Sequence, residues 1–283
     1  MKISRRTFLK VCAGGLALGL AGDFFLGGKR RYSFGEARRV LKGGGYDLLD
    51  EKVVDAESPE YIIILGEIHN ISSSFVASCI KDFIRLRLIT GCGLENVVGN
   101  RGEDILERTR RSTAGTYLEH LSHIKNDSLF YMNYGFLLGQ QSGIQAYGLE
   151  DVKLYERCLI GLDLLSDISL NFSDKRQVPI EEIKKRLENF GFKFSQEELE
   201  NTNRLRGLYK RLRKTVDNIQ IEQRNEVAIS KINPGDAVLV GFMHVKGLKD
   251  LFPGNVLVPN SIKTCGVLNQ ALSKVQRKIY EAV

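Results

Sequence analysis

The sequence predicts an α/β fold: a mostly parallel central sheet with helices on both faces and a helical insertion. Short apolar runs suited to buried strands recur along the chain, at residues 61–65, 144–151 and 237–242. Between them lie segments whose apolar residues recur at helical spacing, such as residues 72–91. Strands that alternate with helices favour a parallel sheet that is covered on both sides.

The first half of the chain divides into a leader at residues 1–31, a lead-in at residues 32–60 and the start of the main domain, which spans residues 61–283. Glycine-rich pieces in the lead-in flank a short predicted helix at residues 34–42. The next predicted elements are a strand at 61–65, a helix at 72–91, a short strand in "ITGCGLEN", helices over 101–142, a strand at 144–151 and a helix at 152–166.

A helical insertion is predicted at about residues 170–233. The segment "PIEEIKKRLENFG" has proline and glycine at the ends expected of a helix. The segment that opens at Ser195 has a Ser…Glu capping box and predicts one helix of about ten turns. Its basic stretch "RLRGLYKRLRK" could lie on a membrane or on nucleic acid, but it is more typical of a solvated helix face. A strand at 237–242, a short helix, a strand at 255–259 and a helix at 263–281 complete the domain.

The positive charge of the chain is concentrated in the leader. The formal net charge is +7, and residues 1–31 hold seven basic side chains against Asp23 alone, so the rest of the chain carries about +1. Apart from the basic stretch in the insertion, the body has no basic stripe with interleaved aromatic residues of the kind that binds nucleic acid. We therefore expect no nucleic-acid partner.

The leader itself predicts export. "SRRTFLK" precedes the apolar stretch "VCAGGLALGLAG", and this pattern resembles a twin-arginine signal. The resemblance implies that the twin-arginine translocation machinery carries the folded chain to a periplasmic or other extracytoplasmic location. Small residues before Gly22 fit a cleavage site, whereas an uncleaved leader would anchor the protein in the membrane. The alternative is an amphipathic helix that begins with basic residues.

Four cysteines follow the leader, and their spacing leaves two interpretations open. They are Cys79, Cys92, Cys158 and Cys265, and no two of them form a C-x-x-C pair. An oxidising compartment allows disulfides, but buried free thiols fit the sequence equally well.

Four predicted strands end in a related way: GEIH, GLEN, GLED and GFMH. In open parallel sheets, ligands bind outside the carboxyl ends of the strands. Glycine at such a turn lets the backbone bend sharply and approach a ligand closely. The candidate site residues that these endings supply are Glu67, His69, Glu95, Glu150, Asp151 and His244.

Two imidazoles and several carboxylates from separate strands are the donor set of a divalent metal site, although they do not identify the metal. A catalytic metal lowers the pKa of a bound water, and a nearby carboxylate can then act as a base. The alternative is structural: the histidines would be satisfied at the strand ends, and the carboxylates would cap helices.

The order of these motifs resembles the superfamily that includes TraB, Tiki proteases, ChaN and erythromycin esterase. "LGEIHNISSS" is most similar to the ChaN-type opening, "GLENV" to the acidic second strand, "QRNEVAISKI" to the helix that carries the family arginine, and "VGFMHVKGL" to the closing motif. The resemblance covers residues 60 to about 250. One departure is Asn70, which stands where aspartate often follows the first histidine.

The resemblance implies roles for His69, Glu95, Arg224 and His244, and extends to Glu67. Our leading hypothesis is an exported, metal-dependent hydrolase that acts on a small-molecule or peptide substrate. His69 and His244 would bind the metal, Glu67 or Glu95 would act as ligand or base, and Arg224 would stabilise an oxyanion. Further candidates are Glu150, Asp151 and Asn225.

Because the superfamily includes both activities, a haem- or iron-binding protein without hydrolytic activity is the alternative. Tyr131, Tyr134 and Tyr147 could stack on or ligate haem, although aromatic residues at helical spacing more often form core. His120 and His123 share a predicted helix face and could ligate metal or cover the site. A third hypothesis is a scaffold whose strand-end residues only hold the sheet together.

Overall fold

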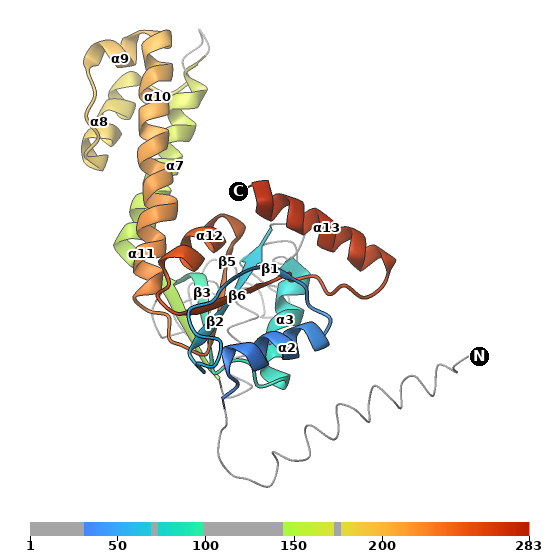
Figure 1. The fold of residues 1–283 in the computed structure, drawn as a ribbon. Helices are drawn as coiled ribbons and strands as arrows, with labels where there is room; N and C mark the ends of the chain where they lie inside the picture. Colours follow the sequence, from blue (N-terminus) through green and yellow to red (C-terminus); the bar gives the residue numbers. More distant parts are fainter. Residues whose placement is uncertain (1–30, 69–72, 99–143, 173–176, 283) are drawn as a thin grey trace, which may run out of the picture. The chain divides into compact units, whose positions relative to one another are not determined.

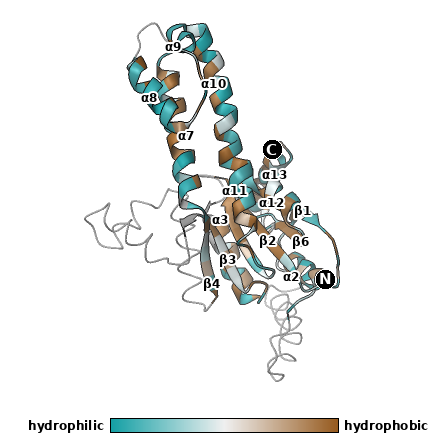
Figure 2. Cartoon of the chain, turned by 90° about the vertical axis from the view of Figure 1, so that its left-hand side faces the viewer, coloured by the Kyte–Doolittle hydropathy of each residue, from teal (hydrophilic) through white to brown (hydrophobic). Residues whose placement is uncertain are grey.

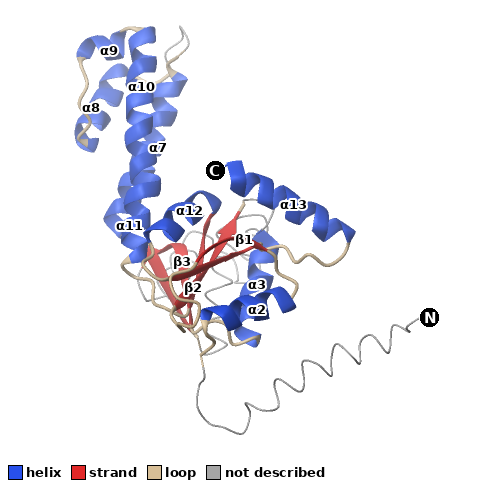
Figure 3. Cartoon of the chain, in the orientation of Figure 1, coloured by secondary structure: helices blue, strands red, loops and turns tan. Residues whose placement is uncertain are grey.

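The computed structural model describes residues 31–68, 73–98, 144–172 and 177–282. The twin-arginine motif, His69 and the helices predicted at 101–142 lie outside these residues. Residues Ser33–Val283 form one compact unit. The predicted fold class is confirmed, because this unit contains a six-stranded, mostly parallel sheet with helices packed around it (Figures 1 and 3).

The strand order across the sheet is β1-β6-β2-β5-β3-β4. All neighbouring pairs are parallel except β1 and β6, which are antiparallel. The strands are β1 (Leu48–Lys52), β2 (Tyr61–Glu67), β3 (Gly91–Val98), β4 (Gln145–Glu150), β5 (Asp236–Gly241) and β6 (Asn255–Pro259). Every residue of β2 and of β6 is buried, as the apolar runs of a covered parallel sheet require.

The segment at residues 32–60, expected as a lead-in, contributes two elements to the same compact unit. Helix α2 (Phe34–Gly43) opens with a capping box between Ser33 and Glu36. Strand β1 follows and lies at the edge of the sheet beside β6. Its residues, LLDEK, show no alternation of apolar and polar side chains, so no strand was predicted there.

One face of the sheet packs against the helices near the end of the chain. Ile62 and Ile64 of β2, with Val238 and Val240 of β5, belong to a single apolar cluster on this face. The helices that cover it are α11 (Arg224–Ile229), α12 (Phe242–Leu251) and α13 (Val267–Ala282). Helix α3 (Ser73–Arg85) connects β2 to β3 and also contacts β2.

Gly66, the glycine of the GEIH motif, allows helix α12 to pack closely against strand β2. It lies within β2, and a Cβ atom at this position would be 2.5 Å from Phe242 Cδ2 and 2.7 Å from Val245 Cγ2. Both distances are shorter than a carbon–carbon contact allows, so only glycine lets α12 approach the strand this closely. We expected Gly66 to bend the chain toward a ligand, but it instead brings α12 against β2.

The predicted insertion forms a helical arm whose helices are α7 (Val152–Leu170), α8 (Ile180–Phe190), α9 (Gln196–Glu200) and α10 (Thr202–Asp217). Helix α7 packs against α10, so the arm begins at the end of β4, earlier than residue 170. Leucine-rich faces give the arm its own apolar core, and α10 is largely hydrophilic on its outer side (Figure 2).

The start and stop signals of α8 are confirmed, because Pro179 precedes the helix and Gly191 ends it with a left-handed backbone at φ 76°. The capping box at Ser195 is also present, but the single long helix predicted from it is wrong. The helix stops after five residues at Asn201, whose backbone is extended. The Asn201 side chain then caps α10, as asparagine favours.

The four cysteines beyond the leader are free thiols; Cys265 is exposed and the other three are buried. Within the part of the chain that the structure describes, none of the helices combines the length and apolar character needed to cross a membrane.

Replacing Gly66 with alanine should destabilise the protein by about 1–3 kcal/mol, because the added methyl group forces α12 away from β2. Gly207 is the matched control: it lies in α10, and a Cβ atom there would meet nothing within 4 Å. Gly207→Ala should stabilise the protein by about 0.5–1 kcal/mol through helix propensity. Urea unfolding measures both changes, and a neutral Gly66→Ala variant would contradict the packing role.

Candidate functional site

The carboxyl ends of β2, β5, β3 and β4 lie side by side, because these strands are consecutive in the sheet. Glu67, Gly241 and Glu150 are the last residues of β2, β5 and β4, and Glu95 lies where β3 leaves its regular pairing with β4. Such irregularities in a sheet often redirect a side chain beside a functional site. The sheet therefore brings three of the four related strand endings to the same buried cluster.

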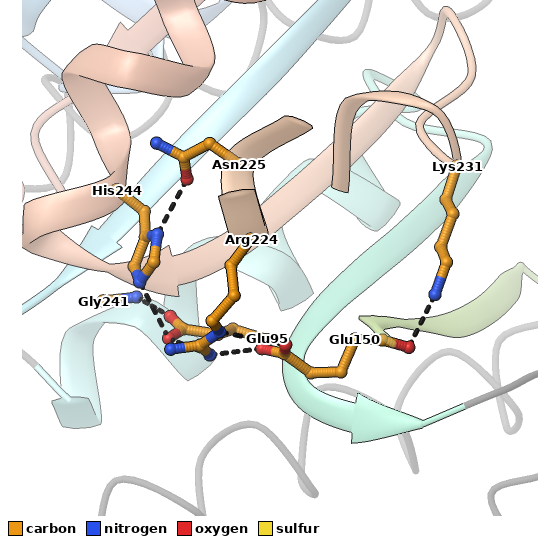
Figure 4. Close-up of polar contacts among 7 residues, drawn as sticks. All are labelled: Glu95, Glu150, Arg224, Asn225, Lys231, Gly241 and His244. Carbon is orange, nitrogen blue, oxygen red and sulfur yellow. Dashed lines mark hydrogen bonds and ion pairs between the residues drawn. The ribbon is translucent and has the colours of Figure 1, made fainter. Parts of the chain in front are cut away.

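Arg224 lies at the centre of this cluster and contacts two carboxylates (Figure 4). Its Nε donates to Glu150 Oε2 at 3.0 Å, and its Nη2 donates to Glu95 Oε1 at 2.8 Å and to Glu150 Oε1. All three side chains are buried. Burial lowers the pKa of Arg224, but the hydrogen bond to Glu150 and the two carboxylate charges outweigh it and raise the pKa.

Glu95 accepts hydrogen bonds from several sides. Besides Arg224, its contacts are the backbone amide of Gly241 and His244 Nε2, which lies 3.2 Å from Glu95 Oε1. Burial by itself raises the pKa of Glu95, but the hydrogen bond and charge of His244, the charge of Arg224 and the Gly241 amide lower it to about 2. Glu95 is therefore ionised at neutral pH although it is buried.

The other nitrogen of His244 is fixed by Asn225. His244 Nδ1 lies 2.7 Å from Asn225 Oδ1, and both side chains are buried (Figure 4). Because an amide oxygen can only accept, Nδ1 carries the proton, and the Nε2 atom faces Glu95. Gly247, one turn after His244 on α12, makes room for the Asn225 amide, because a Cβ atom there would overlap it.

Arg224 and Asn225 reach the site from the end of the arm. They begin α11 directly after η2 (Asn218–Gln223), a π-helical turn that continues α10. Single π-helical turns inside α-helices are frequent at functional sites. No feature of the "NIQIEQ" stretch predicted this turn from the sequence.

Three contacts of the cluster were not expected. The Tyr155 ring on α7 lies 5.5 Å from the Arg224 guanidinium, Lys231 Nζ donates to the backbone oxygen of Glu150 at 2.6 Å, and the Gly241 amide binds Glu95. Of these three contacts, only that of Tyr155 could have been predicted from the sequence, because Tyr155 lies one turn into the helix that follows Glu150.

The remaining candidates are placed differently. Glu67 is buried at the end of β2, and strand alternation puts it on the face opposite to Ile64, which packs on the α12 side. Asp151 is exposed and caps α7 by accepting from the Leu154 amide, which is the structural role considered for it. The buried hydroxyl of Tyr147 donates to Asp236. The other tyrosines and histidines named as candidates lie outside the described residues.

The space enclosed by the cluster is small. A cavity of about 10 Å³ is lined by Glu95, Glu150, Arg224, Asn225 and His244 together with apolar side chains. This volume is close to that needed by one water molecule. Among the residues that the structure describes, no three His, Cys, Asp or Glu side chains are grouped so that they could hold a metal ion. A third ligand would have to come from elsewhere, and His69 follows Glu67 by two residues.

Comparison of the chain with protein-family models, curated protein sequences and solved structures finds no match. The chemistry of the cluster is therefore the basis on which a function can be proposed.

The protein should lose stability in acid as Glu95 takes up a proton. Its folded pKa of about 2 is below the ordinary 4.5, so its stabilising contribution is complete above pH 4.5 and is lost as the pH falls toward 2. The difference in pKa corresponds to a contribution on the order of 3 kcal/mol. Urea unfolding at a series of pH values measures it, and Glu95→Gln should have a smaller pH dependence in this window. An equal dependence in that variant would exclude Glu95 as the source.

Removing the guanidinium should leave two buried carboxylates facing one another. We expect Arg224→Met to cost about 3–5 kcal/mol at pH 7, as for other buried ion pairs that lose one partner. Part of this loss should be regained near pH 5, where a carboxylate can take up a proton in place of the lost cation. Arg224→Lys keeps the charge and should be less destabilised. Unfolding curves with no recovery in mild acid would contradict this account of the cluster.

Proposed function

We propose that this protein is an exported, metal-dependent hydrolase whose site is the buried cluster at the carboxyl ends of β3, β4 and β5. The observation that carries the proposal is the orientation of His244. Its Nδ1 is bonded to Asn225 Oδ1 at 2.7 Å, and its Nε2 is directed at Glu95 Oε1 at 3.2 Å. In metal sites, a ligating histidine is oriented in the same way by a hydrogen bond from its other ring nitrogen.

The contact between His244 and Glu95 requires a cation. With the Nδ1 proton donated to Asn225, Nε2 either donates a proton of its own to Glu95, as in the hydrogen bond that lowers the pKa of Glu95, or presents a lone pair to it. In the second case two acceptors 3.2 Å apart repel one another. A proton or a metal ion shared between them removes the repulsion. Imidazole nitrogen and carboxylate oxygen are both ordinary ligands of zinc and related divalent ions.

The residues present fit such an ion if a third ligand joins them. His244 and Glu95 would hold it together with His69, which ends the GEIH motif. When bound, a divalent ion would supply an activated water and polarise the bond to be cleaved. The cavity beside His244 and Glu95 is of the size of one water molecule.

Within this proposal Arg224 is a positioning residue. Its Nε and Nη2 donors are directed at Glu95 and Glu150, so the contacts of Arg224 favour orientation of the carboxylates over stabilisation of an oxyanion. Arg224 also keeps Glu95 ionised, because its charge lowers the pKa of that carboxyl group. Glu67 lies on the opposite face of the sheet, so of the two carboxylates considered as base, Glu95 is the one beside His244.

The predicted leader supplies the location. A twin-arginine signal implies that the chain folds before export, which allows a metal to be inserted in the cytoplasm. The protein would then act on a small molecule or peptide outside the cytoplasm, anchored to the membrane if the leader is not removed. Haem or iron binding without hydrolysis is the alternative, and the resemblance to a ChaN-type opening motif supports it.

Metal analysis of the purified full-length chain tests the proposal. We expect about one divalent ion per chain, and His244→Ala should lower the metal affinity at least tenfold. Asn225→Ala should lower the affinity by roughly 10–100-fold, because it removes the hydrogen bond that orients the ring. Hydrolysis of a panel of esters and peptides should fall in parallel with the metal content.

Met243→Ala is the matched control, because Met243 precedes His244 on α12 and its side chain is exposed. It should keep both metal and activity. A chain that binds no metal at any concentration would refute the proposal. An absorption band characteristic of haem on titration, lost in His244→Ala, would instead support the haem-binding alternative.

A further inference from the structure

Helix α13 directs two polar side chains, Ser273 and Gln276, inward. Ser273 is 6% exposed and Gln276 is fully buried. Asn260 Nδ2 donates to Ser273 Oγ at 2.6 Å, and Gln276 Nε2 donates to Ser261 Oγ at 2.8 Å. These bonds hold the helix against the turn that follows β6 and fix which of its faces is buried.

The opposite side of α13 is apolar and exposed. Val267 is 86% exposed, Leu268 72% and Val275 45%. Leu268, Ala271 and Val275 are three and four residues apart, so they form one strip along the helix, and Ala271 is exposed as well. A helix on a water-facing surface normally buries its apolar stripe and exposes its polar one. In α13, Ile279 and Tyr280 do pack on the core, but Leu268, Ala271 and Val275 remain outside, so the helix carries a second apolar strip that is exposed.

Basic side chains lie next to the strip. Lys274 and Lys278 are exposed and one turn apart, and the helix carries Arg277 as well against a single acid, Glu281. An apolar strip flanked by lysine is the pattern of a helix that lies in the surface of an anionic membrane.

The position of α13 in the fold agrees with a membrane contact. Arg277 donates to the backbone oxygen of Leu48, and the Tyr280 hydroxyl donates to Asp50 Oδ2, so α13 lies along the β1 edge of the sheet (Figure 1). The chain enters the compact unit at Ser33, and α2, which begins there, is joined to β1 by the Arg38–Glu51 ion pair. Ser33, where the compact unit begins, therefore precedes a helix that is paired with this same edge of the sheet.

We propose that α13 lies in the surface of an anionic phospholipid membrane, with Leu268, Ala271 and Val275 in contact with the acyl chains and Lys274 and Lys278 at the headgroups. Three apolar side chains by themselves would bind a membrane only weakly, and stable attachment requires a second membrane-binding element. An uncleaved leader would provide that element, and α13 would then fix which side of the domain faces the bilayer.

The chain contains no tryptophan, so a single introduced tryptophan reports its own surroundings. Leu268→Trp places the reporter in the strip, and Gln270→Trp, exposed on the other side of the same helix, is the matched control. Each full-length variant is added to vesicles of phosphatidylcholine with phosphatidylglycerol, without and with brominated acyl chains. We expect Leu268→Trp to shift its emission to the blue and to be quenched by the brominated lipid, whereas Gln270→Trp keeps the emission of a water-exposed ring.

Reversing the two lysine charges supplies a second measurement. Lys274→Glu with Lys278→Glu, in the Leu268→Trp background, should reduce the quenching on the anionic vesicles on the order of tenfold. Thermal unfolding of all variants should match that of the parent chain, because every altered side chain is exposed.

Three results would overturn the proposal. The first is water-like emission from Leu268→Trp on the vesicles. The second is equal quenching on vesicles without phosphatidylglycerol, which would remove the role of the lysines. The third is a blue shift that depends on protein concentration in the absence of vesicles, which would indicate that a second copy covers the strip.

Discussion

The buried guanidinium of Arg224 is the contact on which the arrangement of the site depends. It joins Glu95 of β3 to Glu150 of β4, and it begins the helix that packs on the sheet. Two carboxylates this close could not both stay ionised in a dry interior without a cation between them. Their charge in turn holds Arg224 at the strand ends, so the arginine and the two glutamates stabilise one another.

The same contact connects the sheet to the helical arm. Glu150 is the residue before the cap of α7, and Arg224 follows the π-helical turn that ends the return path through α10. The two ends of the arm thus carry partners of one ion pair. Closing this pair fixes where α7 leaves the sheet and where α10 returns, and the leucine-rich core of the arm keeps the two helices together between those points.

The sequence was informative wherever a local rule decides the structure. Apolar runs located the central strands, Pro179 and Gly191 marked the ends of α8, and the related strand endings indicated that Glu95, Glu150 and His244 would meet. The antiparallel strand β1 was missed because its charged, half-exposed residues follow no apolar pattern and depend on pairing with β6. The break in the helix at Asn201 was also missed. Asparagine can cap a helix, and by doing so it interrupts what had been predicted as one longer helix.

The roles of the site residues were harder to predict than their positions, because a role depends on what each polar atom faces. The oxyanion role of Arg224 stays a prediction, and what the structure adds is that its Nε and Nη2 donors are directed at Glu95 and Glu150. Asn225 was a minor candidate, yet it determines which nitrogen of His244 carries the proton. Without the hydrogen bond to Asn225, the His244 ring could rotate or change its tautomer. The hydrogen bond from Nδ1 prevents this and leaves Nε2 directed at an ionised carboxylate, and the proposed metal site rests on that pairing.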